Sequence, residues 1–257
     1  MSLQQRPLGH TGIQVSCVGL GTVKLGRNQE VKYPQSFSLP EDAQVLDLLA
    51  QAKQLGINLL DTAPAYGSSE QRLGRLVSDR DSWVICTKVG EEFTVGKSYY
   101  DFSAEHTQRS IERSLRNMQT DYLDIVLIHS DGRDLQIIES SACLETLERL
   151  KDKGLIKAIG MSTKTLEGGM KAVDLMDVVM VTYNSTATED GKVIDYANSK
   201  NKGVLIKKAL NSGHGCSDEI GAENNMRFAL GRDGVSSVIV GTINPKHLLE
   251  NVNAASQ

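Results

Sequence analysis

The sequence predicts an α/β protein: a (β/α)8 TIM barrel with a short N-terminal β-hairpin, formed by residues 1–257 as a single domain. Two observations lead to this fold. Eight short, apolar and β-branched segments alternate with helical segments along the chain, as expected for parallel strands that helices cover. The length of 257 residues also matches the roughly 250 residues that one such barrel typically uses.

The elements are expected in a regular order. A His10-Thr11-Gly12 turn between two apolar stretches predicts a hairpin over residues 6–16. Strands are expected at residues 15–21, 57–61, 83–88, 123–129, 156–162, 177–184, 203–208 and 236–241. Helices are expected at residues 39–56, 68–79, 103–118, 139–154, 164–176, 190–203, 219–234 and 245–255. Pro40 and Gly56 stand at the start and the end of the first helix, where these residues are typical.

An open, doubly wound sheet is the alternative for such an alternating chain. Its signature is a G-x-G-x-x-G turn that opens a helix after the first strand. Here Gly19 and Gly21 are followed by Gly26, two positions too late, and no helix is expected to begin there. The barrel is therefore the preferred interpretation.

Composition narrows the class of protein. The net charge of -4, from 28 basic and 32 acidic residues, predicts neither a nucleic-acid partner nor binding to an anionic membrane. The N-terminus has no signal-peptide pattern, and no apolar run of about 18 residues occurs. None of the four cysteines forms a C-x-x-C pair, so no metal site is expected, and Cys17, Cys86 and Cys143 are interpreted as buried thiols. We expect a cytoplasmic protein.

Four polar residues are expected to meet at one end of the barrel. The carboxyl ends of the strands and the loops after them build the active site of this fold. The second, third and fourth strands lead to Asp61, Lys88 and His129, and Tyr66 lies in the loop after Asp61. Each residue alone is most simply a cap, a surface charge or a packing residue, but four at the same rim favour a functional site.

The chemistry of this set suits reduction of a carbonyl group. A free phenol has a pKa near 10, and a nearby cation lowers it. Lys88 is the candidate cation, Asp61 its counter-ion and Tyr66 the general acid, while His129 would donate a hydrogen bond to a carbonyl oxygen. No activated Ser or Cys nucleophile accompanies them, so an external hydride donor is expected.

Several motifs support a family resemblance. The segment DTAPAYG at residues 61–67, the opening RPLGHTGIQVSCVGLGT at 6–22 and the C-terminal VSSVIVGTINPKHLLEN at 235–251 resemble the aldo-keto reductases. The resemblance runs from end to end. It implies a (β/α)8 barrel with Asp61, Tyr66, Lys88 and His129 as a catalytic tetrad. It also implies a nicotinamide cofactor, NADP(H) or possibly NAD(H), and a small-molecule aldehyde or ketone that is reduced to an alcohol.

The resemblance further implies where the cofactor binds. Gly21 and Thr22 would approach the nicotinamide ribose next to Asp61, and Ser162 the carboxamide. Ser212 would help to hold the pyrophosphate, and the final helix the adenosine half. The complete implied set is Gly21, Thr22, Asp61, Ser162, Lys207, Ser212, Thr242 at the 2′-phosphate, His247, and Glu250 and Asn251 at the adenine.

The sequence departs from the family pattern at several cofactor positions. Many family members have Asn where this chain has Thr163, and Gln where it has Met180. An aromatic ring usually stacks on the nicotinamide at the position of Lys207, and a basic pair is common at the positions of Gly241 and His247. These changes predict weaker cofactor affinity and a less strict preference for NADP(H). Lys207 has two open interpretations: it faces the nicotinamide and favours the uncharged, reduced form, or it contacts phosphate, as Lys208 also could.

Two other functions stay open on the same fold. One is a cofactor-binding sensor or regulatory subunit that keeps the tetrad but acts by binding a partner. The other is a sugar or polyol dehydrogenase that runs toward oxidation. The sequence leaves the oligomeric state unknown.

Overall fold

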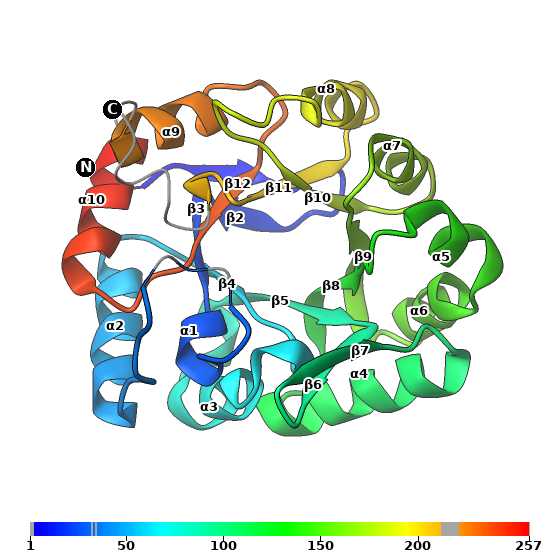
Figure 1. Cartoon of the computed structure of the whole chain (residues 1–257), viewed down its shortest axis with the longest axis horizontal. Helices are drawn as coiled ribbons and strands as arrows, with labels where there is room; N and C mark the ends of the chain where they lie inside the picture. The colour runs from blue at the N-terminus through cyan, green and yellow to red at the C-terminus, as the bar shows by residue number, and fades with distance from the viewer. Residues whose placement is uncertain (1–2, 32, 34, 212–220, 257) are drawn as a thin grey trace.

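The computed structural model describes residues 3–31, 33, 35–211 and 221–256, and within these ranges eight parallel strands form a closed barrel (Figure 1). The strands are β3 (Val18–Gly21), β4 (Leu59–Asp61), β5 (Val84–Val89), β8 (Leu123–His129), β9 (Ile156–Ser162), β10 (Val178–Thr182), β11 (Gly203–Lys207) and β12 (Ser237–Val240). They neighbour one another in chain order, and β12 pairs with β3 to close the ring. The predicted barrel is confirmed.

Helices surround the barrel (Figure 1). Those expected from the sequence are α2 (Asp42–Gln54), α3 (Ser69–Leu76), α4 (Ala104–Met118), α6 (Cys143–Asp152), α7 (Leu166–Leu175), α8 (Gly191–Ser199), α9 (Gly221–Leu230) and α10 (Pro245–Ala255). Ser103, Thr165 and Asn244 begin α4, α7 and α10 by accepting hydrogen bonds from backbone N–H groups of the first turn. Such caps each stabilise a helix by about 1 kcal/mol.

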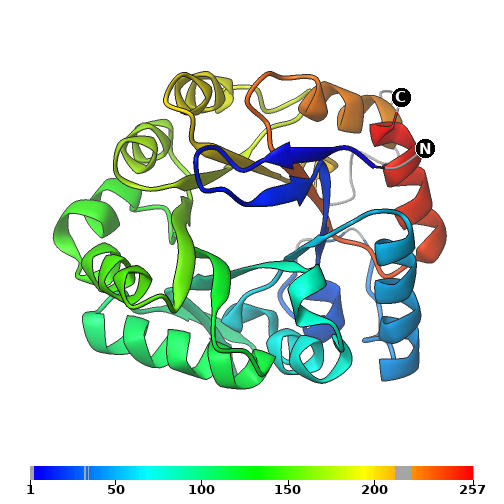
Figure 2. The ribbon, with the colours of Figure 1, turned by 180° about the vertical axis from the view of Figure 1, so that it is seen from behind.

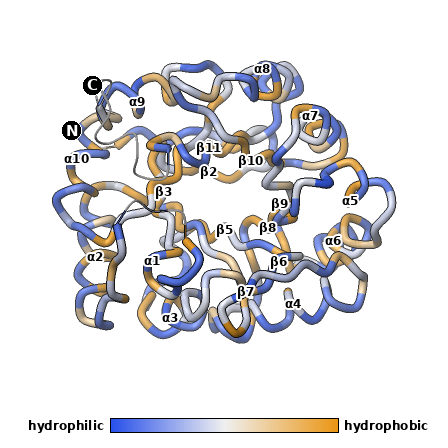
Figure 3. The backbone as a smooth tube through the Cα atoms, viewed as in Figure 1, coloured by the Kyte–Doolittle hydropathy of each residue, from blue (hydrophilic) through white to orange (hydrophobic). Residues whose placement is uncertain are grey.

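Two apolar layers hold the strands in place. Along β8, Val126 and Ile128 join the layer beneath the helices, whereas Ile125 and Leu127 point into the barrel. This alternation follows from the period of two of a strand. Figure 3 shows the hydrophilic positions on the outward faces of the helices. Each fully buried Leu or Ile contributes about 1.5–3 kcal/mol, so the paired layers fix the strand register that positions the site.

The predicted N-terminal hairpin is present and covers one end of the barrel (Figure 2). It consists of β1 (Gln5–Pro7) and β2 (Gln14–Ser16). Leu8 and Val15 pack into the barrel interior, and Ser236 Oγ, just before β12, donates a hydrogen bond to Pro7 O at 3.0 Å. Because the hairpin contacts the amino ends of the strands, the carboxyl ends remain open for a site.

The structure corrects one local expectation after the first strand. A one-turn helix, α1 (Val23–Gly26), begins directly after Thr22, where no helix was expected. The turn is held by a distant side chain, since Arg72 donates to Leu25 O at 2.6 Å. Such a long-range bond has no local signature in the sequence. Other short helices not anticipated are η1 (Pro64–Tyr66), η2 (Arg80–Ser82) and α5 (Asp134–Ser140).

A second hairpin, also not anticipated, rises beside the site. It consists of β6 (Glu91–Thr94) and β7 (Lys97–Tyr100), which pair only with each other. Val95 and Gly96 have φ values of 51° and 73°, as a tight two-residue hairpin turn requires. Gly90 has a φ of 103°, and a Cβ there would lie 2.3 Å from the Phe102 ring. Glycine is therefore needed to turn the chain out of β5 into this hairpin.

Two further findings concern the chain as a whole. Within the described ranges, no helix combines the length and the apolar character needed to cross a membrane. Cys17, Cys86 and Cys143 are buried free thiols, as expected, while Cys216 lies outside the described residues.

Candidate active site

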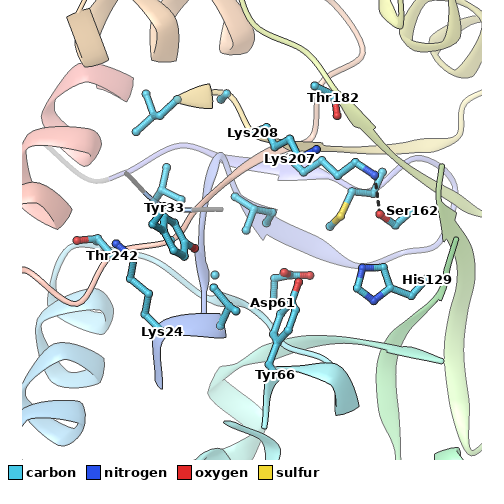
Figure 4. Close-up of a pocket in the computed structure, with 18 of the residues that line it drawn as sticks. Lys24, Tyr33, Asp61, Tyr66, His129, Ser162, Thr182, Lys207, Lys208 and Thr242 are labelled. Carbon is cyan, nitrogen blue, oxygen red and sulfur yellow. Dashed lines mark hydrogen bonds between the residues drawn. The ribbon is translucent and has the colours of Figure 1, made fainter. Parts of the chain in front are cut away.

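The four residues predicted to be catalytic lie together at the carboxyl end of the barrel. Asp61 and His129 are the last residues of β4 and β8, Lys88 is the penultimate residue of β5, and Tyr66 ends the turn η1. All four line one cavity. Figure 4 shows Asp61, Tyr66 and His129 around the same space. The positions at the strand ends therefore converge as the fold requires.

Lys88 is the electrostatic centre of this group. It is 1% exposed, and its Nζ donates to Asp61 Oδ1 at 2.6 Å and to Thr62 O at 2.9 Å. The same Nζ lies 4.8 Å from the centre of the Tyr66 ring. Burial acts to lower the pKa of Lys88, but the Asp61 carboxylate and Tyr66 raise it above its ordinary value. The ammonium group is therefore charged throughout the physiological range.

The pKa of Tyr66 corrects the expectation from sequence. Burial is the largest influence and raises the pKa of the phenol to about 12, although Lys88 acts to lower it. Asp61 adds a smaller increase. The cation works in the expected direction, but desolvation of the phenolate outweighs it. Tyr66 is thus fully protonated at neutral pH, ready to donate a proton but not to accept one.

His129 stands at right angles to Tyr66, with ring centres 6.3 Å apart and an interplanar angle of 87°. Burial lowers the pKa of His129 below its ordinary value. Its Nδ1 lies 2.9 Å from Oε2 of Glu91, the first residue of β6. Sequence reasoning missed Glu91, although the alternating EEFTVGKSYY segment with its Val-Gly turn carries a hairpin signal that would have placed it at this rim.

Hydroxyl groups brace the loop that carries Tyr66. Thr22 Oγ1 donates to Asp61 O at 2.8 Å, and Ser69 Oγ lies 2.8 Å from Thr22 Oγ1. Thr22 is fully buried and is absent from the cavity lining. Its hydroxyl therefore holds the wall behind the site in place rather than facing the cavity.

The cavity has a volume of about 1210 Å³, larger than a typical pocket for a drug-sized ligand. Its wall includes most of the residues assigned to the cofactor by resemblance: Gly21, Asp61, Ser162, Lys207, Thr242, His247, Glu250 and Asn251. Thr163, Met180 and Gly241, where the sequence departs from the family pattern, also line it. Ser212 lies outside the described residues.

Lys207 contacts the wall formed by the end of β9. Its Nζ donates to Ser162 Oγ at 2.8 Å and to Thr163 O at 2.7 Å, as Figure 4 shows for Ser162. Burial, followed by the charge of Lys208, lowers the pKa of Lys207 to about 7. The Lys207 amine is therefore close to half-protonated near neutral pH.

A pH-dependent stability is expected from Lys207. Its amine has a pKa of about 7 in the folded chain and about 10.4 in an unfolded one. At pH values between these two, the unfolded chain binds more protons than the folded chain, so the contribution of Lys207 to the free energy of unfolding rises with pH. Below the folded pKa the buried amine is charged, and the full cost of burying that cation is present. In chemical denaturation, we expect the free energy of unfolding to rise less from neutral to alkaline pH in Lys207→Met than in the wild type. Parallel profiles would contradict the lowered pKa.

The residues around the cavity fit an extended dinucleotide. Lys24, Lys207 and Lys208 supply amino groups along its wall and His247 an imidazole, all of which can form hydrogen bonds with phosphates. The backbone is also close to the cavity at Gly241, where an added Cβ would lie 2.8 Å from Tyr33 Oη. Lys24 Nζ lies 4.0 Å from the centre of the Tyr33 ring (Figure 4). Sequence reasoning missed Tyr33, which no local motif marks.

Comparisons with known proteins agree with the fold and the geometry. A sequence model of the Aldo/keto reductase family matches residues 17–226. L-galactose dehydrogenase of Arabidopsis thaliana is 28% identical over 298 residues, which cover 99% of this chain and 89% of that protein. D-arabinose 1-dehydrogenase of Saccharomyces cerevisiae is 36% identical over 132 residues, or 48% of this chain and 37% of that protein.

A crystal structure from Pseudomonas aeruginosa, described as that of an aldo-keto reductase, superimposes with a TM-score of 0.90. It is 50% identical and covers 98% of this chain and 94% of its own. The family model and this structural likeness both extend over most of the chain. The protein is therefore an oxidoreductase that belongs to the aldo-keto reductase family.

Proposed function

We propose that the chain is an NADP(H)-dependent reductase that converts a small aldehyde or ketone to an alcohol. The observation that carries the proposal is the position of Lys88, whose ammonium group lies between the Asp61 carboxylate and the face of Tyr66 at the edge of a large cavity. Family membership supports a nicotinamide cofactor, and the three buried free thiols suit a reducing compartment such as the cytoplasm.

Residues of two regions would hold the cofactor. Thr242, His247, Glu250 and Asn251 line the part of the cavity next to α10 and would bind the adenosine half. Ser162 would bind the carboxamide: its oxygen already accepts from Lys207, which leaves its single proton free to be donated. When bound, the nicotinamide supplies the hydride. Gly241 and His247 replace a common basic pair, so the preference for NADP(H) over NAD(H) should be modest.

Tyr66 would protonate the oxygen of the substrate. A pKa of about 12 keeps the phenol protonated at neutral pH, as a proton donor must be. As the proton leaves, negative charge develops on the phenol, and the fixed Lys88 ammonium stabilises it. Asp61 holds that ammonium in place by the bond at 2.6 Å. The three residues therefore act as one unit in proton transfer.

Oxidation of a sugar is a second candidate function. The names of the two curated relatives above, L-galactose dehydrogenase and D-arabinose 1-dehydrogenase, favour it. In that direction Tyr66 would have to accept a proton as phenolate. Since its pKa is about 12, oxidation by this site should accelerate as the pH rises, whereas reduction should not.

A substrate panel tests both candidates. We expect oxidation of NADPH, and more slowly of NADH, when simple aldehydes are added to the purified protein. The reverse assay uses NADP+ or NAD+ with a panel of aldoses over a range of alkaline pH. Tyr99→Phe is a matched control for Tyr66→Phe, because Tyr99 lies on β7 and is 49% exposed. Cofactor binding without turnover of any carbonyl or sugar would contradict the proposal and favour a sensor.

A further inference from the structure

Lys207 is held at the wall of the cavity by two neutral oxygen atoms. It is the last residue of β11 and is partly buried, and its side chain reaches to the end of β9 (Figure 4). There its Nζ donates to Ser162 Oγ at 2.8 Å and to Thr163 O at 2.7 Å. Within the described part of the chain, no ion pair joins Lys207 to a carboxylate. The contacts of this amine therefore do not require it to carry a charge.

The two nearest acidic groups are engaged elsewhere. Asp134 accepts hydrogen bonds from two backbone N–H groups just before α7, and Asp190 accepts one from the N–H group at the end of β10. Both carboxylates act to raise the pKa of Lys207. Burial, Lys208 and Lys164 act to lower this pKa and outweigh the two acids. The surroundings of the amine thus resist its protonation.

A neutral Lys207 would have the geometry of a nucleophile. A neutral amine has two N–H groups and one lone pair, and the two acceptors Ser162 Oγ and Thr163 O match the two N–H groups. The lone pair is then the unused site on the nitrogen, and Lys207 lines the cavity of about 1210 Å³. His129 lines the same cavity, and burial lowers its pKa below the ordinary value, so it adds no positive charge at neutral pH. Desolvation and a neighbouring cation are the two conditions that activate lysine amines in proteins.

From this arrangement we infer that Lys207, placed beside the cation of Lys208, is a nucleophilic amine that forms a reversible imine with small aldehydes that enter the cavity. The lone pair attacks the carbonyl carbon, and one proton passes from nitrogen to oxygen. The hydroxyl group of this carbinolamine then leaves as water with the second proton of the nitrogen. The step needs neither an oxidant nor a reductant, and water restores the free amine.

This site is separate from the proton donor of the proposed reaction. Tyr66 would protonate a carbonyl oxygen, whereas Lys207 bonds to a carbonyl carbon. The reactivity of Lys207 does not depend on the proposed function, because imine formation requires only an aldehyde and a neutral amine. One consequence does depend on that function: an imine on Lys207 occupies the wall beside Ser162, where the carboxamide would bind, so aldehydes in excess should compete with the cofactor.

Reductive methylation of the intact protein tests the amine. At neutral pH, ¹³C-formaldehyde forms imines with neutral lysines, and a mild borane reductant converts each imine to a methylated amine that peptide mass spectrometry locates. A lysine with the ordinary pKa of about 10.4 is neutral in fewer than about one molecule in a thousand. We expect Lys207 to be methylated roughly tenfold faster, or more, than Lys97, an exposed lysine on β7. Methylation of Lys207 at the rate of Lys97, or more slowly, would overturn the inference.

Two substitutions at one position test the role of the neighbouring cation. Lys208→Met removes the charge that lowers the pKa of Lys207, so methylation of Lys207 at neutral pH should slow severalfold. Lys208→Arg keeps a positive charge and is the matched control, in which the rate should stay close to that of the wild type. Circular dichroism checks that both variants are folded. Equal rates in the two variants would refute activation by Lys208.

The cofactor provides a test of the proposed competition. NADPH present during methylation should protect Lys207 but not Lys97, because only Lys207 lies on the wall assigned to the cofactor. Equal methylation of Lys207 with and without NADPH would refute the competition and the cofactor position proposed above. The relative rates of Lys207 and Lys97 without NADPH decide the nucleophilic amine independently of that result.

Discussion

Replacing Tyr66 by Phe should reduce kcat by about 10²–10⁴-fold, the range that a positioned general acid contributes. The substitution removes one oxygen and leaves the ring, which packs 6.3 Å from the ring of His129, in place. Steady-state kinetics with the best aldehyde of the panel would measure the loss. Because the hydroxyl would act on the transferring proton, kcat should fall more than KM rises.

Cofactor binding provides the control for this variant. Titration of NADPH into Tyr66→Phe should give an affinity close to that of the wild type, and chemical denaturation should give a similar midpoint. Activity within a few-fold of the wild type in Tyr66→Phe, with the fold intact, would show that another group supplies the proton.

Replacing Lys88 by Met should destabilise the protein on the order of 3–5 kcal/mol, the cost of leaving one member of a buried ion pair alone. Asp61 is 4% exposed, and Lys88 is its ion-pair partner at 2.6 Å. Urea denaturation of the wild type and variant would measure the change in the free energy of unfolding. Activity should be lost as well, since the developing phenolate of Tyr66 would no longer face a cation.

A double variant separates these two effects of Lys88. Lys88→Met combined with Asp61→Asn removes both charges and should recover a large part of the stability that the single variant loses. It should not recover activity. If the double variant is no more stable than Lys88→Met alone, the unpaired carboxylate is not the source of the destabilisation.

The barrel and the meeting of the four polar residues could be predicted because both depend on repeated local patterns. Apolar β-branched runs gave the strands, and the residues that follow them necessarily lie at the same rim. A correct prediction of where the strands end was enough to place Asp61, Lys88 and His129. Sequence motifs at residues 61–67 and 235–251 pointed to the cofactor wall, and most residues named there line the cavity.

Properties that depend on competing or distant interactions could not be predicted. Burial raises the pKa of Tyr66 and the charge of Lys88 lowers it, and burial has the larger effect. The sequence shows that a lysine is present but not how deeply the phenol is buried. The helix α1 depends on Arg72, which lies 47 positions beyond Leu25. Thr22 was expected at the cavity, but its hydroxyl is engaged behind the wall.

The independence of the β6–β7 hairpin has a consequence for how such a barrel acquires new specificities. Its two strands pair with each other and not with the barrel. A segment built in this way can be exchanged or redesigned as a cassette without altering a single strand pairing of the scaffold. The carboxylate of Glu91, which lies 2.9 Å from His129 Nδ1, is thus carried by an accessory piece of chain, so the surroundings of that imidazole and the fold can change separately.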